Sequence, residues 1–336
     1  MDPKVSWSRV AWWGALVAFT ISSGFGQAAN AAKRSAAVRT VPLRTINGQP
    51  NLEGYWTNST FTPLERPVEL GTKEFYTEAE ALAFEKQRLQ RENSQPPTDI
   101  HYDNVAWQSE NYSKGNLNRR TSLIFDPPDG RIPPLSEAGK KHEVLVKQAA
   151  ARRVAAPSAD SRSLAERCIS WGAEGPPMLG TTYNSNLQIV QTATSVSIYN
   201  EMVHHVRIIP VDGTPHLPST IRQLSGDSRG HWEGETLVVD TINFTDETPF
   251  RGPPAIARQD IFSSREMRVI ERFTRTGPDT IQYRFTVDDP GTWTKPWSGE
   301  LLLRRFEGPI LEYACQEGNY GLANILAAAR AAEKKK

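Results

Sequence analysis

The stretch Thr280-Ile-Gln-Tyr-Arg-Phe-Thr-Val-Asp288 decides the fold class of this chain. Ile281, Tyr283, Phe285 and Val287 occupy alternate positions and therefore share one face, while polar residues share the other. A period of two is typical of an antiparallel strand that buries one face. Turn-forming residues flank the stretch, at 277–279 and 288–291. It therefore predicts one strand of a meandering β-sheet.

Similar alternation predicts further strands over 187–192, 195–209, 235–244, 266–275 and 299–306. Short strands joined by hairpin signals favour a sandwich or a closed barrel. We therefore expect a mainly β protein, an antiparallel barrel of the lipocalin or calycin type, decorated with helices. Residues 51–333 are expected to form one domain after an extended lead-in over 32–50. Helices are predicted over 77–90, 136–154 and Tyr320 to Glu333, the first from the capping box Thr77-Glu-Ala-Glu80.

Residues 1–31 have the features of a secretory signal. Lys4 and Arg9 precede an apolar run of 12 residues, and Ala29-Asn-Ala31 has the A-x-A spacing of a cleavage site. The run is shorter than the ~20 residues of a membrane-spanning helix. We therefore expect cleavage after Ala31 and a periplasmic or secreted protein without a membrane span; the alternative is an uncleaved N-terminal anchor.

Composition excludes several classes of protein. The 336 residues include 39 Lys and Arg against 38 Asp and Glu, a net charge of +1, which argues against a nucleic-acid partner. Two cysteines are too few for a disulfide-dense scaffold or a cysteine-based zinc ribbon. Because an exported chain meets oxidising conditions, we expect Cys168 and Cys315 to form a disulfide, with two free thiols as the alternative.

The predicted strand 195–209 carries the first candidate for catalysis. Its more apolar face, which we expect to point inward, includes Asn200 and His204. An inward histidine among apolar residues has the chemistry of a general acid or base tuned by desolvation. The alternative is a structural histidine that is hydrogen-bonded in the interior.

The second candidate is the cluster between Arg222 and Glu235. Its glycines predict a tight hairpin loop, in which Asp227 and His231 could form an orienting pair. Arg222 or Arg229 could bind an anionic or carbonyl group. The alternative is a solvated hairpin with local salt bridges.

The chain lacks the spaced motifs of metal and nucleotide sites, so we expect no cofactor. If a metal were bound, His204, His216 and Asp227 would be its ligands. Aromatic residues near the C-terminal strands could instead line an apolar cavity, although such residues also form cores. The predicted substrate-binding residues are Trp56, Asn200, Tyr283, Trp293, Trp297 and Tyr313.

Four blocks of sequence resemble a large uncharacterised family of exported proteins from soil bacteria. They are Leu52-Glu-Gly-Tyr-Trp-Thr57 and the segments 120–130, 226–240 and 313–320, the third reading GDSRGHWEGETLVVD. The resemblance spans about residues 45–330 and implies export but no particular reaction. Separately, Gly54-Tyr-Trp56 resembles the G-x-W entry strand of lipocalins, from which the helices at 77–90 and 136–154 depart. Lipocalin-like barrels include binders of apolar molecules and some enzymes without cofactors.

Together these observations predict an exported enzyme that needs no cofactor. It would perform acid–base chemistry of the lyase, hydratase or isomerase type on an apolar or aromatic small molecule in a barrel cavity. His204 would be the base or acid, Asp227 with His231 would orient it, and Arg222 or Arg229 would stabilise negative charge. The alternatives are a binding protein for a hydrophobic small molecule and a metal-dependent hydrolase.

Overall fold

The computed structural model describes residues 43–93, 119–180, 184–247 and 263–334. The predicted signal peptide, its cleavage after Ala31 and most of the lead-in lie outside these residues. Residues Val41–Lys336 belong to one compact unit. None of the helices in the described ranges is both long and apolar enough to cross a membrane.

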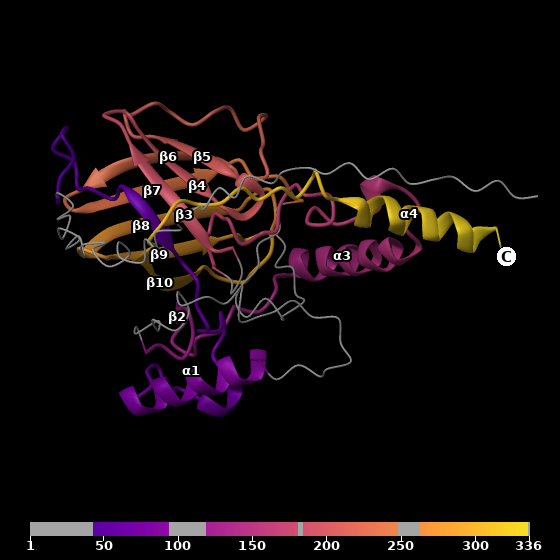
Figure 1. Ribbon diagram of the computed structural model, residues 1–336, viewed down its shortest axis with the longest axis horizontal. Coiled ribbons are helices and arrows are strands. Elements are labelled where there is room, and N and C mark those ends of the chain that lie inside the picture. The colour runs from indigo at the N-terminus through magenta and orange to yellow at the C-terminus, as the bar shows by residue number, and fades with distance from the viewer. Residues whose placement is uncertain (1–42, 94–118, 181–183, 248–262, 335–336) are drawn as a thin grey trace, which may run out of the picture. The chain divides into compact units, whose positions relative to one another are not determined.

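The described strands form a ten-stranded antiparallel sheet that curls into a nearly closed barrel (Figure 1). Along the sheet the strand order is β5-β4-β3-β1-β10-β9-β8-β7-β6, and β2 also pairs with β10. The predicted mainly β barrel with helices is therefore confirmed. The strands are β1 Gly54–Thr57, β2 Ile124–Asp126, β3 Asn186–Gln191, β4 Ser195–Asn200, β5 Val206–Pro210, β6 Asp227–Glu233, β7 Thr236–Ile242, β8 Arg268–Gly277, β9 Thr280–Asp288 and β10 Trp297–Arg305.

Strand β9 is the alternating stretch that predicted the fold. Its four apolar side chains are fully buried, while the residues between them are partly or fully exposed. Phe285 lies opposite Gly299 of β10, where a Cβ would come within 2.3 Å of the phenyl ring. The glycine therefore makes room for the ring in the core.

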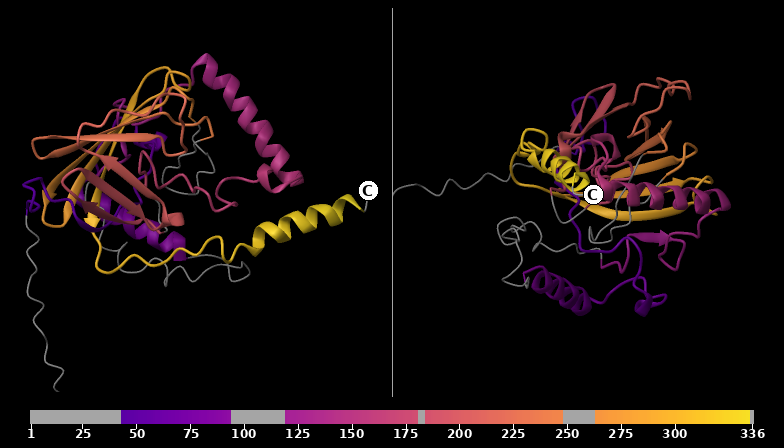
Figure 2. Two further views of the ribbon diagram at one scale, coloured as in Figure 1. Left: turned by 90° about the horizontal axis from the view of Figure 1, so that it is seen from above. Right: turned by 90° about the vertical axis from the view of Figure 1, so that its right-hand side faces the viewer.

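The described part of the chain contains three α-helices. They lie outside the barrel in both further views (Figure 2). They are α1 Glu78–Asn93, α3 Glu137–Ala155 and α4 Tyr320–Glu333, close to the predicted ranges. Thr77 and Glu80 form the expected capping box, in which each side chain accepts a hydrogen bond from the other residue's backbone N–H. Ser136 caps α3, because its hydroxyl oxygen accepts a hydrogen bond from Gly139 N at 3.0 Å.

The prediction of one continuous strand over 195–209 was wrong. The chain turns at Glu201–His204 and returns, so β4 and β5 form a hairpin. Val203 and His204 adopt positive φ angles of 49° and 43°, although neither residue is a glycine or an asparagine, the residues that signal this conformation in a sequence. After the turn the two faces exchange: Arg207 is buried and His204 is exposed.

The barrel closes where β5 meets β6, at the two ends of the sheet. No backbone ladder joins these strands in the described chain, yet they lie in contact. A Cβ on Gly230 of β6 would lie 2.9 Å from Val211 Cγ1 and 3.0 Å from Ile209 Cγ2. Side-chain packing against the glycine therefore closes one end of this junction. We call the junction of β5 and β6 the seam.

The segment 227–233, predicted as a hairpin loop, is strand β6. The actual turn is shorter and centres on Gly234 and Glu235, between β6 and β7. The predicted disulfide is present: Cys168 and Cys315 are bonded, with their Cα atoms 5.8 Å apart. It joins the segment before residue 170 to the chain that leads into α4.

Candidate functional site

A cavity of about 440 Å³ lies at the open end of the seam. Its walls come from three segments, 169–174, 205–208 and 223–228. The first follows Cys168, the second covers the start of β5, and the third is the turn that leads into β6. We call it the seam cavity. It combines apolar residues such as Ile169 and Leu224 with titratable groups, and both kinds of surface are typical of ligand sites.

His205 places an uncharged imidazole at this cavity. Its Nε2 lies 2.8 Å from the Ser225 hydroxyl oxygen, which belongs to the opposite wall. Burial and then the charge of Arg207 lower the pKa of His205 from 6.5 to about 4. The ring is therefore neutral at pH 7. Its Nδ1 is buried and has no hydrogen-bond partner among the described residues.

Glu174 contributes a buried carboxyl group to the same cavity. Its Oε1 accepts hydrogen bonds from the Ser170 hydroxyl at 2.5 Å and from Trp171 N at 3.1 Å. Oε2 is buried and, in the described part of the chain, has no partner. Burial outweighs these hydrogen bonds and raises the pKa of Glu174. This carboxyl group therefore keeps its proton to a higher pH than an exposed glutamate.

Asn200, the last residue of β4, is hydrogen-bonded to the backbones of both Glu174 and His205. Its side-chain amide donates to the backbone oxygen of Glu174 at 3.4 Å, and its backbone N–H donates to His205 O at 2.8 Å. Asn200 was predicted to bind substrate directly. The structure shows it buried, where it positions the residues that line the cavity.

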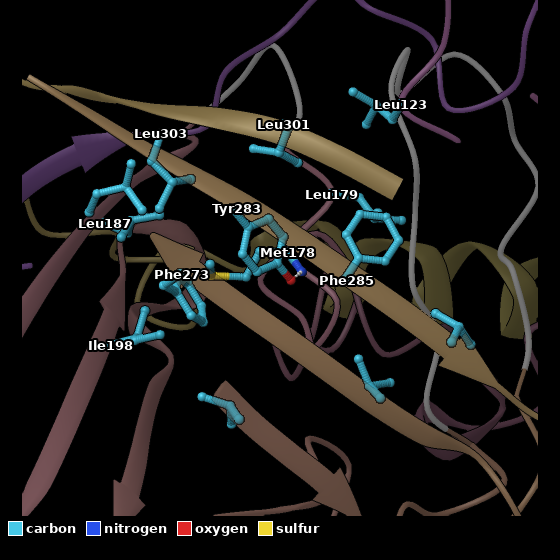
Figure 3. Close-up of a cluster of buried hydrophobic side chains, with 14 of the residues drawn as sticks. Leu123, Met178, Leu179, Leu187, Ile198, Phe273, Tyr283, Phe285, Leu301 and Leu303 are labelled. Atoms are coloured by element: carbon cyan, nitrogen blue, oxygen red, sulfur yellow. Dashed lines mark hydrogen bonds between the residues drawn. The ribbon is translucent and has the colours of Figure 1, made fainter. Parts of the chain in front are cut away.

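Behind the cavity wall lies a buried ion pair. Arg207 donates to Glu271 of β8 through two nitrogens, at 2.7 and 3.0 Å, and both side chains are at least 95% buried. The Tyr283 hydroxyl donates to Glu271 at 2.8 Å. It also accepts from Met178 N at 2.8 Å, and Figure 3 shows these two residues side by side. These bonds fasten the segment that carries Glu174 to the barrel interior. Tyr283, a predicted substrate residue, belongs to this core network.

The other aromatic residues predicted to bind substrate are also mainly core. Trp56 and Trp297 are fully buried, and Trp293 packs edge-on against Trp297 with ring centroids 5.7 Å apart. Tyr313 is half-buried on the segment before Cys315. None of these residues lines the seam cavity.

His204 does not point inward, so the structural basis for its predicted catalytic role was wrong. It lies in the turn between β4 and β5, exposed, with Nδ1 3.2 Å from the Tyr313 backbone oxygen. The reversal of faces after the turn brings its neighbour His205 to the cavity instead. Because the turn residues have positive φ, alternation alone assigns the wrong histidine.

Asp227 is buried at the cavity wall, but its histidine partner is His216 rather than the predicted His231. His216 Nδ1 lies 2.8 Å from Oδ2, Leu217 N donates at 2.9 Å, and Arg229 donates to Oδ1 at 2.6 Å. Burial acts to raise the pKa of Asp227, but these groups outweigh it and the pKa is lowered. His231 lies four residues along the same strand, roughly 13 Å away.

The predicted anion-binding arginines have other partners. Arg229 is paired with Asp227 and also donates to the backbone oxygens of Ser228 and Pro215. Arg222 donates to the backbone oxygens of Phe244 and Arg265. Both therefore fasten the turns around β6.

Of the three predicted metal ligands, His216 and Asp227 are in contact, whereas His204 is bound to the Tyr313 segment. In the described ranges, no group of three or more His, Cys, Asp or Glu residues has the arrangement of a metal site.

Comparison with known proteins found no match: no family, no curated protein and no solved structure resembles the chain significantly. The resemblances to exported soil-bacterial proteins and to lipocalins therefore stay predictions.

Sequence reasoning did not identify Glu174, His205 or Ser225 as site residues. Glu174 and Ser225 lie in irregular segments, and His205 was placed on the outer face. One signal was present: His204 and His205 are adjacent, so a turn between 200 and 204 that shifts the register by one residue exchanges their faces.

Proposed function

We propose that this protein is an exported enzyme that performs acid–base chemistry at the seam cavity without a cofactor. The reaction would be of the lyase, hydratase or isomerase type, on a small apolar or aromatic molecule. The observation that carries the proposal is that Glu174 and His205 line one cavity, where the pKa of the glutamate is raised and that of the histidine is lowered.

An exposed histidine normally holds its proton to a higher pH than a glutamate does. Burial reverses this order here, because both groups are favoured in their uncharged forms. Opposite displacement of two pKa values is characteristic of an acid and a base that work as a pair. Glu174 is assigned as the proton donor and His205 as the acceptor.

The remaining walls fit this chemistry. Ile169, Leu224 and Ile208 supply apolar surface for the substrate. Arg207 reaches the cavity from the buried ion pair, so its charge would stabilise an oxyanion or enolate formed beside it. Export rests on the sequence of residues 1–31, and the Cys168–Cys315 disulfide is compatible with it.

The test uses the mature, disulfide-bonded protein and a panel of unsaturated and hydroxylated apolar acids, ketones and lactones. Products are followed by mass spectrometry and chromatography for isomerisation or for gain or loss of one water. We expect conversion of at least one class, reduced ~10²–10⁴-fold in Glu174→Gln. Glu166→Gln is the matched control, because Glu166 lies in the same part of the chain but pairs with Arg162 away from the cavity.

Two results would overturn the proposal. A compound that is retained in native mass spectra but never converted would identify a binding protein. Equal turnover in Glu174→Gln and Glu166→Gln would remove Glu174 from the mechanism.

A further inference from the structure

We propose that Ser225 is a nucleophile activated by His205, and that the seam cavity also hydrolyses small esters. This activity goes beyond the acid–base step proposed above and does not depend on it. The observation is the contact of 2.8 Å between the Ser225 hydroxyl oxygen and His205 Nε2 at the wall of a cavity. This contact places a hydroxyl nucleophile beside a neutral imidazole that can act as its general base.

The turn that carries Ser225 is fixed on both sides. Gly226 N donates to Gln223 O at 3.1 Å, and Gln223 N donates to Asn243 O at 3.0 Å. Gly226 has φ of +66°, and a Cβ there would lie 2.6 Å from the Thr241 side chain. The turn is therefore packed against β7, and Ser225 is held at a defined place opposite β5.

The other serines of the cavity have different partners. Ser170 donates to the carboxyl group of Glu174, and Ser228 shares a hydrogen bond with Thr241 at 2.9 Å. Among the cavity serines, Ser225 is the one paired with an imidazole. Ser225 is partly exposed, unlike the buried Ser228.

The reaction balances with water as the co-reactant. The Ser225 oxygen attacks the ester carbonyl carbon while its proton passes to His205 Nε2. The bond from that carbon to the alcohol oxygen then breaks, and the leaving alkoxide takes the proton from His205. Water attacks the acyl-serine with His205 again as base, which releases the carboxylic acid and restores the serine hydroxyl.

A fluorophosphonate probe tests the nucleophile without knowledge of the natural substrate. The mature, disulfide-bonded protein is labelled and the modified peptide is mapped. We expect one label on Ser225, absent in Ser225→Ala and formed ~10²-fold or more slowly in His205→Asn. Ser195→Ala is the control, because Ser195 is bonded to Thr192 at an exposed turn and should leave labelling unchanged.

Short-chain p-nitrophenyl esters supply the second readout, with turnover expected to be lost in Ser225→Ala and kept in Ser195→Ala. Labelling of other serines at the same rate, or labelling of Ser225 that ignores His205→Asn, would overturn the proposal. Circular dichroism and the intact disulfide mass show whether each variant is folded; if His205→Asn is not, His205→Gln replaces it. The label and the ester turnover are measured without the compounds used for the acid–base proposal, so failure of that proposal and failure of this one give different results.

Discussion

Replacing Glu271 with glutamine should remove much of the protein's stability. The substitution keeps the shape of the side chain but leaves Arg207 with no opposite charge. The side chains of Glu271 and Arg207 are 0% and 5% exposed. Two charge-assisted hydrogen bonds, of 2.7 and 3.0 Å, lose their anionic acceptor. Breaking a buried ion pair at one partner costs about 3–5 kcal/mol, because the remaining charge stays desolvated. We expect Glu271→Gln to lose about that much free energy of unfolding.

Urea unfolding at pH 7 measures this loss. Glu233→Gln is the control, since Glu233 pairs with Arg272 on the surface, with side chains 48% and 43% exposed, and such pairs contribute about 0–1 kcal/mol. Replacing both buried partners by apolar residues, as Arg207→Met with Glu271→Leu, should recover most of the stability. If Glu271→Gln cost no more than Glu233→Gln, the pair would not be desolvated and the argument would fail.

Three further predictions concern the seam and the segment beside it. Because the pKa of His205 falls from 6.5 to about 4 on folding, the unfolded state binds the extra proton between these values. Lowering the pH through that window should cost about 3 kcal/mol of stability, a loss that His205→Gln should not show in pH-dependent urea unfolding. Gly230→Ala should destabilise by about 1–3 kcal/mol, because its methyl group would clash with the side chains of Ile209 and Val211, whereas Gly277→Ala, with no atom within 4 Å, should not. Replacing Cys168 and Cys315 with serine should cost about 4–5 kcal/mol in thermal unfolding, since the bond closes a long loop.

Each of these has an outcome that contradicts it. Identical pH profiles of the wild type and His205→Gln would mean that the imidazole is solvated. Equal melting temperatures of the two alanine variants would mean that the seam tolerates a side chain. A double serine variant as stable as the wild type would show that the disulfide does not constrain the unfolded chain.

Much of the barrel could be predicted because apolar and polar residues alternate regularly along its strands. In β9 the apolar face and the bracketing turns both carry a local signal, and the same holds for the capping box at Thr77. The turn at 201–204, between β4 and β5, carried no such local signal. Val203 takes a left-handed conformation that tertiary packing imposes against the preference of a β-branched residue, so no local rule finds the turn.

The site could be predicted in part. Sequence reasoning found the right region of the chain, since Asp227 lines the cavity and the turn before it carries Ser225. It could not find Glu174, because a glutamate in an irregular segment becomes distinctive only through burial. Nor could it bring residues 174, 205 and 225 together, because that depends on which strands lie at the two ends of the sheet.

The closure of the barrel by side chains has a consequence for how this protein could diversify. Backbone ladders hold the sheet from β5 round to β6, while the junction of its two ends depends on packing around Gly230. Segments 205–208 and 223–228 border that junction, so substitutions there would alter the cavity while every ladder stays intact. Relatives of this chain should therefore differ in ligand chemistry along the seam far more readily than in architecture, as side-chain replacements accumulate there without loss of strand pairing.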